Sequence, residues 1–267
     1  MVGFIVKMSV LFLIFFVLSL MSGILMNLLL TALISGLISF VLTWFLGLEN
    51  FVFRSILIIL RCLLKKEVRL SISYLFSIKI DGRYLLVQGN RINKQFQPVG
   101  GVVKYYDEAK STLKKMNAKD DNCMPIDQDS ENDLRIRIPG WKLRYFLKWF
   151  YSREDREVTV EREFREELLE SGILPKEYFR ILKFRYLRTS MFYKPKRVSK
   201  LNPKSHEFLL AEVYEFLPTD EQEIALRSTM TNGKDHYKWC SESEIESEGV
   251  EINSQSAKIS ENSLWIL

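Results

Sequence analysis

The sequence predicts an α/β or α+β domain, preceded by an N-terminal hairpin of two transmembrane helices. Three observations lead to this. A long segment without charged residues opens the chain, β-rich runs alternate with helical segments after it, and the helix with the clearest motif lies among these runs. There is no internal repeat. The part after the membrane segment is therefore expected to form one domain.

Residues 8–48 contain no charged side chain. One bilayer crossing takes about 20 residues, so a single straight helix of this length would be about twice as long as the membrane is thick. We therefore expect two spans in residues 1–48, with a tight turn near Met26 and Asn27. A signal peptide is the competing interpretation, because Lys7 precedes the apolar run. The run is too long for that and has no cleavage motif of small residues.

The flanking charges predict the orientation of the hairpin. Lys7 precedes the first span, and the turn between the spans has no Lys or Arg. Five basic residues follow the second span: Arg54, Arg61, Lys65, Lys66 and Arg69. The positive-inside rule then places both ends of the hairpin in the cytoplasm. Residues 49–68 are expected to form a basic juxtamembrane helix, which either lies among anionic head groups or packs on the next domain.

Residues 69–267 have the composition and the residue pattern expected of a cytosolic domain. Two β-rich runs are joined by Asp81-Gly82, a dipeptide favoured in type I′ hairpin turns, and Gly100-Gly101 allows positive φ or a close backbone approach. An insertion is expected at about 104–152, and its polar, acidic middle predicts a loop. Residues 141–151 predict a basic, aromatic helix. That helix either packs on a neighbouring element or faces a membrane or nucleic acid.

The net charge, the cysteines and the histidines limit the possible functions. The formal net charge of +5 is too small to indicate nucleic-acid binding without a local cluster. The three cysteines, Cys62, Cys123 and Cys240, are widely spaced and have neither metal-binding nor disulfide spacing, so reduced thiols are expected. His206 and His236 belong to no metal or catalytic pattern, and structural roles are expected for both.

The most informative stretch is "REVTVEREFREELLESGI", residues 156–173. Read as a helix, it has a core stripe of Val160, Phe164 and Leu168. Glu163, Glu166 and Glu170 would then share a neighbouring face, where carboxylates could hold Mg²⁺ against a diphosphate. The alternative is a solvated charged face, on which Glu161 and Arg165 form a favourable i, i+4 pair.

The same stretch resembles the Nudix box, whose pattern is Gly, five residues, Glu, seven residues, then Arg-Glu-apolar-x-Glu-Glu-x-Gly-apolar. Glu157 is followed by seven residues and then by 165–173, "REELLESGI". "SIKIDGRYLLVQ", "QPVGGVV" and "HYKWCSESEI" resemble the early strands, the Pro-Gly-Gly segment and the late tryptophan segment of that superfamily. The resemblance covers most of 69–267 and implies the Nudix sandwich, a mixed sheet between helices.

The sequence departs from the box pattern at important positions. Tyr151 replaces the opening glycine of the box, and Leu169 replaces the first of its paired glutamates, which are metal ligands in catalytic members. In this register a metal ligand is missing, so we expect no catalytic residue, no bound metal and no enzyme activity. If the protein is nevertheless a hydrolase, the resemblance implies Glu166 and Glu170 as catalytic residues. Mg²⁺ would then be held by Glu163, Glu166 and Glu170.

Two spans followed by a degenerate Nudix domain resemble the membrane-anchored, SMODS-associated Nudix effectors of bacterial anti-phage systems of the CBASS type. In such systems a nucleotidyltransferase makes a cyclic nucleotide on infection. The resemblance implies a bacterial inner-membrane effector that senses this nucleotide. Its hairpins would oligomerise and impair the membrane, with no cofactor. The expected partners are a cyclic di- or oligonucleotide, membrane lipids and further copies of the chain, but no DNA or RNA duplex.

A basic stretch offers independent support for an anionic ligand. Residues 178–206 contain no acidic side chain and many basic ones. Lys183 and Arg185 would point to one face of a strand, and arginine binds phosphates bidentately. A solvated loop or a surface facing acidic lipids remain alternatives. The predicted nucleotide-binding residues are Arg165, Glu166, Glu170, Lys183, Arg185, Arg188, Gly100 and Gly101.

Overall fold

The computed structural model describes residues 51–89, 95–121, 130–194, 206–231, 235–247 and 259–267, with a few single positions before residue 39. The chain divides into two compact units, Met1–Phe53 and Arg54–Leu267. Almost all of the predicted transmembrane hairpin lies outside the described residues. Among the residues that are described, no helix is both long and apolar enough to cross a bilayer. The fold below is that of the second unit.

The larger sheet is built around β1. Its strand order is β6-β7-β1-β9-β8, and β5 pairs with the C-terminal half of β1. The strands are β1 (Val68–Ser77), β5 (Gly100–Val102), β6 (Lys119–Asp120), β7 (Arg135–Ile138), β8 (Phe184–Lys194) and β9 (His206–Phe216). β1 and β9 are parallel, whereas β5 and β7 are antiparallel to β1. The sheet is therefore mixed, as the resemblance implied.

The smaller sheet has the order β10-β3-β2, with β4 beside β3. Its strands are β2 (Lys79–Ile80), β3 (Arg83–Gln88), β4 (Phe96–Pro98) and β10 (Tyr237–Ser241). The β2–β3 hairpin turns at Asp81 and Gly82, whose φ angles are 49° and 75°. A type I′ turn needs positive φ at both central residues, so the predicted turn is confirmed.

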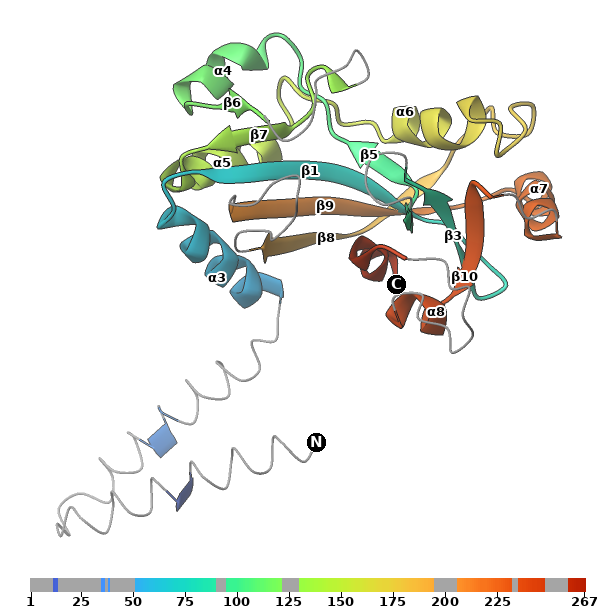
Figure 1. The fold of residues 1–267 in the computed structure, drawn as a ribbon, viewed down its shortest axis with the longest axis horizontal. Coiled ribbons are helices and arrows are strands. Elements are labelled where there is room, and N and C mark those ends of the chain that lie inside the picture. Colours follow the sequence, from blue (N-terminus) through green and yellow to red (C-terminus); the bar gives the residue numbers. More distant parts are fainter. Residues whose placement is uncertain are drawn as a thin grey trace, which may run out of the picture. The chain divides into compact units, whose positions relative to one another are not determined.

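The helices lie on different sides of the larger sheet. They are α3 (Phe51–Leu63), α4 (Ala109–Lys115), η2 (Gly140–Lys142), α5 (Leu143–Ser152), α6 (Glu161–Phe164), η3 (Arg165–Glu170), α7 (Asp220–Thr231), α8 (Glu242–Glu246) and η4 (Glu261–Ile266). Figure 1 shows α6 on one side of β1, β9 and β8, and α8 with the C-terminal segment on the other. This layered arrangement fits the sandwich that the resemblance implied.

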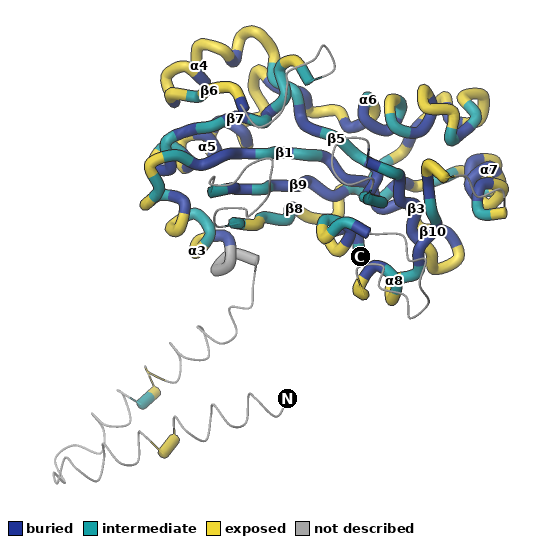
Figure 2. The backbone as a smooth tube through the Cα atoms, in the orientation of Figure 1, coloured by how far each residue is buried: buried dark blue, intermediate teal, exposed yellow. Residues whose placement is uncertain are grey.

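Alternation along the strands assigns each side chain to a face. Leu70, Ile72, Tyr74 and Phe76 of β1 are fully buried in the main core. On the same face, α6 contributes Phe164, which packs against aromatic rings of β8 and β9. The opposite face of β1 and β9 packs against η4 in a second, smaller core. Figure 2 shows buried backbone running through β1 and β9.

The segment expected as an insertion contributes to the sheet. β7 lies inside it and pairs with β1 over four residues, from Val68↔Ile138 to Ser71↔Arg135. Apolar Ile136 and Ile138 alternate with arginines there, and the isoleucines are buried. The central part of the expected loop, 122–129, lies outside the described residues. The acidic composition of the middle therefore obscured a strand that follows it.

The basic, aromatic helix is amphipathic. Leu143, Phe146 and Phe150 of α5 are buried in the main core, which agrees with the packing interpretation. Trp141 and Tyr145 are 54% and 58% exposed, and Arg144 and Lys148 are exposed beside them. The aromatic residues of this stretch thus divide between the core and a basic surface.

The C-terminal end of α3 packs on the domain. Cys62 is fully buried, and the backbone N–H of Gly140 donates to the carbonyl of Lys65 at 3.1 Å. A Cβ at residue 140 would overlap the Cys62 carbonyl oxygen, so glycine permits this close approach. This contact agrees with the linker-helix interpretation of 49–68. Farther from this end, α3 has exposed apolar side chains, including Ile56 and Leu60.

Burial should make the thiol of Cys62 unreactive. Burial raises its pKa to about 12, although nearby Lys65 acts in the opposite direction. Cys240 is also fully buried. In a Cys123→Ser variant, a thiol reagent at pH 8 should therefore label no cysteine in the native protein and both after denaturation. Rapid native labelling of Cys62 would contradict the buried position of this helix end.

Candidate functional site

The motif helix carries one arginine surrounded by three carboxylates. Arg162 of α6 donates from Nε and Nη2 to the two carboxylate oxygens of Glu157, at 2.8 and 2.7 Å. Its Nη2 also donates to Glu163 at 2.6 Å, and its Nη1 donates to Glu166 at 2.8 Å. A charge-assisted pair of this kind is strong because the fork of the guanidinium matches the carboxylate. Arg162 is therefore the centre of this cluster.

Two of the three carboxylates are buried. Glu157 and Glu163 are each 5% exposed, whereas Glu166 lies at the surface end of the cluster. Gly101 of β5 faces Glu163 so closely that a Cβ there would overlap its carboxylate. Gly101 thus allows the strand to approach the helix, and a close approach is what the sequence predicted for the glycine pair.

The position of Glu157 is fixed by its neighbour. Arg156 is 2% exposed and donates to the carbonyls of Phe150 and Glu157, each at 2.7 Å. Its Nη1 also donates to the hydroxyl of Tyr74 at 3.1 Å. The hydroxyl of Tyr74 in turn donates to the carbonyl of Glu157 at 2.7 Å. The main chain that carries Glu157 is therefore held against β1 and the end of α5.

The cluster changes the protonation of its members. Burial raises the pKa of Glu163 to about 7, and Arg162 only partly offsets this. For Arg162, burial alone would lower the pKa, but the surrounding carboxylates raise it above its usual value. The arginine therefore stays charged, while Glu163 titrates near neutral pH.

The raised pKa of Glu163 predicts that stability depends on pH. Between about 4.5, its ordinary value, and about 7, the folded protein holds one more proton at this carboxyl than the unfolded chain. The contribution of Glu163 to stability should therefore fall as pH rises through this window, by at most about 3 kcal/mol. Thermal unfolding of the wild type and of Glu163→Gln across pH 5–8 would measure it. Equal slopes would contradict the assignment.

The structure offers a second register, besides the one that the sequence suggested for the box. Leu169, placed there at a lost metal-ligand position, is 4% exposed and lies in the main core. It is Arg162, and not Arg165, that pairs with Glu157. Residues 162–167, "REFREE", fit the Arg-Glu-apolar-x-Glu-Glu part of the pattern at every position. The absence of a carboxylate at 169 is therefore no sign of lost chemistry in this register.

Sequence reasoning missed Arg162 and the role of Glu157 beside it. The available signal was the complete "REFREE" match at 162–167, three residues before the register that begins at Arg165. The register at Arg165 fits the seven-residue spacing after Glu157, and the sequence interpretation followed that spacing. After Phe164 the helix continues as the π-helical turn η3. Such turns often occur at functional sites and shift the residues that follow them.

The remaining residues of the predicted helix face lie apart from the cluster. Arg165 donates to the Arg180 carbonyl at 3.0 Å and pairs with Glu161 at 3.4 Å, which confirms the predicted i, i+4 pair. Glu170 is exposed at the end of η3, and within the described residues its carboxylate forms no ion pair. The structure thus brings Glu163 and Glu166 together but leaves Glu170 outside.

The basic residues of β8 lie on the other face of the sheet. Arg185 forms an ion pair with Glu215 of β9, and its Nε donates to that carboxylate at 2.8 Å. Arg188 donates to the main-chain oxygens of Trp265, at 2.9 Å, and Leu267. Lys183 is exposed before the strand begins. The predicted nucleotide-binding residues are therefore divided between two faces of one sheet.

The cluster does not fit Mg²⁺ in its present arrangement. Glu157, Glu163 and Glu166 all turn toward the guanidinium of Arg162, which takes the central position among their oxygens. Over the ranges that the structure describes, no group of three or more His, Cys, Asp and Glu side chains is arranged to hold a metal ion. Binding of Mg²⁺ to these carboxylates would require Arg162 to move.

Comparison with protein families identifies the domain. A family profile described as "SMODS-associated NUDIX domain" matches residues 67–267. The chain belongs to this family. Comparison with curated proteins gives no match. The SMODS-associated Nudix match begins at the residue before β1 and includes both sheets, so the mixed sheet and the helices around it are the fold of this family domain.

Proposed function

We propose that this SMODS-associated Nudix protein is an effector of a bacterial anti-phage system of the CBASS type. Its Nudix-like domain senses a cyclic di- or oligonucleotide made on infection. The predicted hairpins at residues 1–48 then oligomerise in the inner membrane and impair it, which ends the infection by loss of the cell. The observation that carries this proposal is the family match over residues 67–267.

The arginine cluster supports recognition over cleavage. Arg162 neutralises the carboxylates that would otherwise be available to a metal ion. While Arg162 holds these oxygens, they are not free to bind a metal ion that would activate water for attack on a diphosphate. A domain of this fold that binds without cutting would transmit a signal and leave its ligand intact.

Calorimetry of the full-length chain in detergent micelles tests the sensing step. A panel of 3′,5′-linked cyclic dinucleotides and trinucleotides should contain at least one member that binds with micromolar or better affinity. The same ligand should then release dye from vesicles that contain the protein, and protein-free vesicles serve as the control. If no member of the panel binds, the sensor proposal fails.

The rival function is a membrane-anchored, Mg²⁺-dependent hydrolase of nucleoside diphosphate derivatives. The observation that favours it is the complete "REFREE" match, with buried Glu163 facing Gly101. It predicts Mg²⁺-dependent release of phosphate products that Glu166→Gln and Glu163→Gln abolish. The matched control is Glu161→Gln, an exposed residue of the same helix that pairs with Arg165, which should remain active. Ligand binding without any turnover would exclude this rival.

A further inference from the structure

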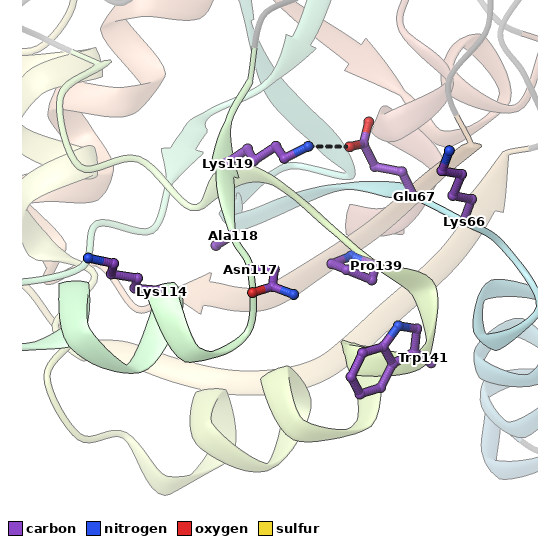
Figure 3. Close-up of a pocket in the computed structure, with 8 residues that line it drawn as sticks. All are labelled: Lys66, Glu67, Lys114, Asn117, Ala118, Lys119, Pro139 and Trp141. Carbon is purple, nitrogen blue, oxygen red and sulfur yellow. Dashed lines mark ion pairs between the residues drawn. The ribbon is translucent and has the colours of Figure 1, made fainter.

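A groove far from the arginine cluster has features of a phosphate site. It has a volume of about 890 Å³ and lies where the end of α3, the end of α4 and the β7–η2 corner meet. Figure 3 shows its lining: Lys66, Glu67, Lys114, Asn117, Ala118, Lys119, Pro139 and Trp141. Its volume is in the range of sites for small organic ligands.

The charges of the groove are unbalanced. Three lysines line it against one glutamate, and that glutamate, Glu67, already pairs with Arg137 at 3.1 Å and with Lys119 at 3.7 Å. Within the described part of the chain, no carboxylate pairs with Lys66 or Lys114, and both are exposed. A hollow lined by charges of one sign concentrates its field and attracts anions. Lysine is a common phosphate ligand in proteins.

An aromatic ring borders the same groove. Trp141 is 54% exposed, and Lys142 holds its Nζ 4.4 Å from the centre of the indole ring. An exposed indole beside lysines suits a ligand that carries both a flat ring and phosphates, because nucleobases stack on aromatic side chains. Asn117, whose backbone φ is 56°, adds a side-chain amide to the rim.

We propose that this groove binds the phosphates of a nucleotide through Lys66 and Lys114, while Trp141 stacks on a base. The proposal rests on the proposed function for the identity of the ligand, a cyclic nucleotide. The location of the site rests on the groove alone. Lys66 follows α3 by only three residues, and Trp141 follows Gly140, which contacts α3. A ligand in this groove would therefore contact Lys66, just after α3, and Trp141, next to the glycine on which the end of α3 packs.

The test compares full-length variants in detergent micelles, with the cyclic-nucleotide panel and inorganic pyrophosphate as probes. Lys66→Gln/Lys114→Gln should weaken binding of both probes about tenfold or more. The charge-matched control changes two exposed lysines elsewhere, Lys79→Gln/Lys176→Gln, and should bind like the wild type. Trp141→Leu should weaken the nucleotide roughly tenfold but leave pyrophosphate unchanged.

The outcomes separate this proposal from the proposed function. If a cyclic nucleotide binds the wild type and Lys66→Gln/Lys114→Gln equally well, the groove assignment is wrong and the sensor stands. If no cyclic nucleotide binds, the sensor fails, and the nucleotide assignment fails with it. In that case, loss of pyrophosphate binding in Lys66→Gln/Lys114→Gln would show that the groove binds phosphate groups but no cyclic nucleotide. Displacement of pyrophosphate by phosphatidylglycerol nanodiscs, but not by nucleotides, would identify a lipid head group instead.

Discussion

Replacing Arg162 with methionine should destabilise the domain by about 3–5 kcal/mol at pH 8. The change leaves Glu157 and Glu163 buried, with their shared cation removed. An uncompensated buried charge is costly because the protein interior solvates it far less well than water does. Part of the cost should disappear at pH 6, because Arg162 lowers the pKa of Glu163 in the native protein, and without it this carboxyl takes up a proton more readily. Chemical unfolding of the full-length protein at both pH values measures this.

Arg165 provides the matched control. It belongs to the same helix but pairs with Glu161 at the surface, where both side chains are more than a third exposed. Exposed pairs of this kind contribute about 0–1 kcal/mol, so Arg165→Met should be nearly neutral. If Arg162→Met and Arg165→Met lose the same stability, the cluster is not the buried network described here. Restoration by Glu157→Gln/Glu163→Gln in the Arg162→Met background would support it.

Much of the fold was predictable because local signals agreed with the final packing. The Asp81-Gly82 turn and the apolar stripe of Phe164 and Leu168 each follow from residue type and from the period of the pattern. Strand β7 was not predictable in the same way. Four residues with alternating arginines are a weak signal, and what fixes them is pairing with β1, which is far away in the sequence.

The site was only partly predictable, for a related reason. Sequence spacing placed the carboxylates on one helix face, and Glu163 and Glu166 do lie together. A turn with i→i+5 hydrogen bonds breaks that spacing after Phe164, so residues 169 and 170 fall elsewhere. The bulge between Tyr186 and Arg188 determines the face of the sheet on which Arg188 lies. No local sequence pattern predicts this bulge.

Gly100→Ala should be among the most damaging single changes in the domain. Gly100 has a φ of +146°, where a side chain is strained, and its Cβ would overlap the backbone carbonyl oxygen of Tyr74 in β1. Strain of this kind costs about 1–3 kcal/mol, and overpacking adds a similar amount. Because the obstacle is backbone in a central strand, no side-chain rearrangement can relieve it.

Gly101→Ala differs in a way that a double variant can reveal. Its Cβ would overlap the carboxylate of Glu163, the far end of a flexible side chain, and no backbone atom is among the nearest contacts. Glu163→Ala should therefore partly rescue Gly101→Ala but give no rescue of Gly100→Ala. Unfolding free energies of the wild type, the three single variants and both double variants measure this coupling. Equal, additive losses would mean that β5 does not approach the motif helix through Gly101.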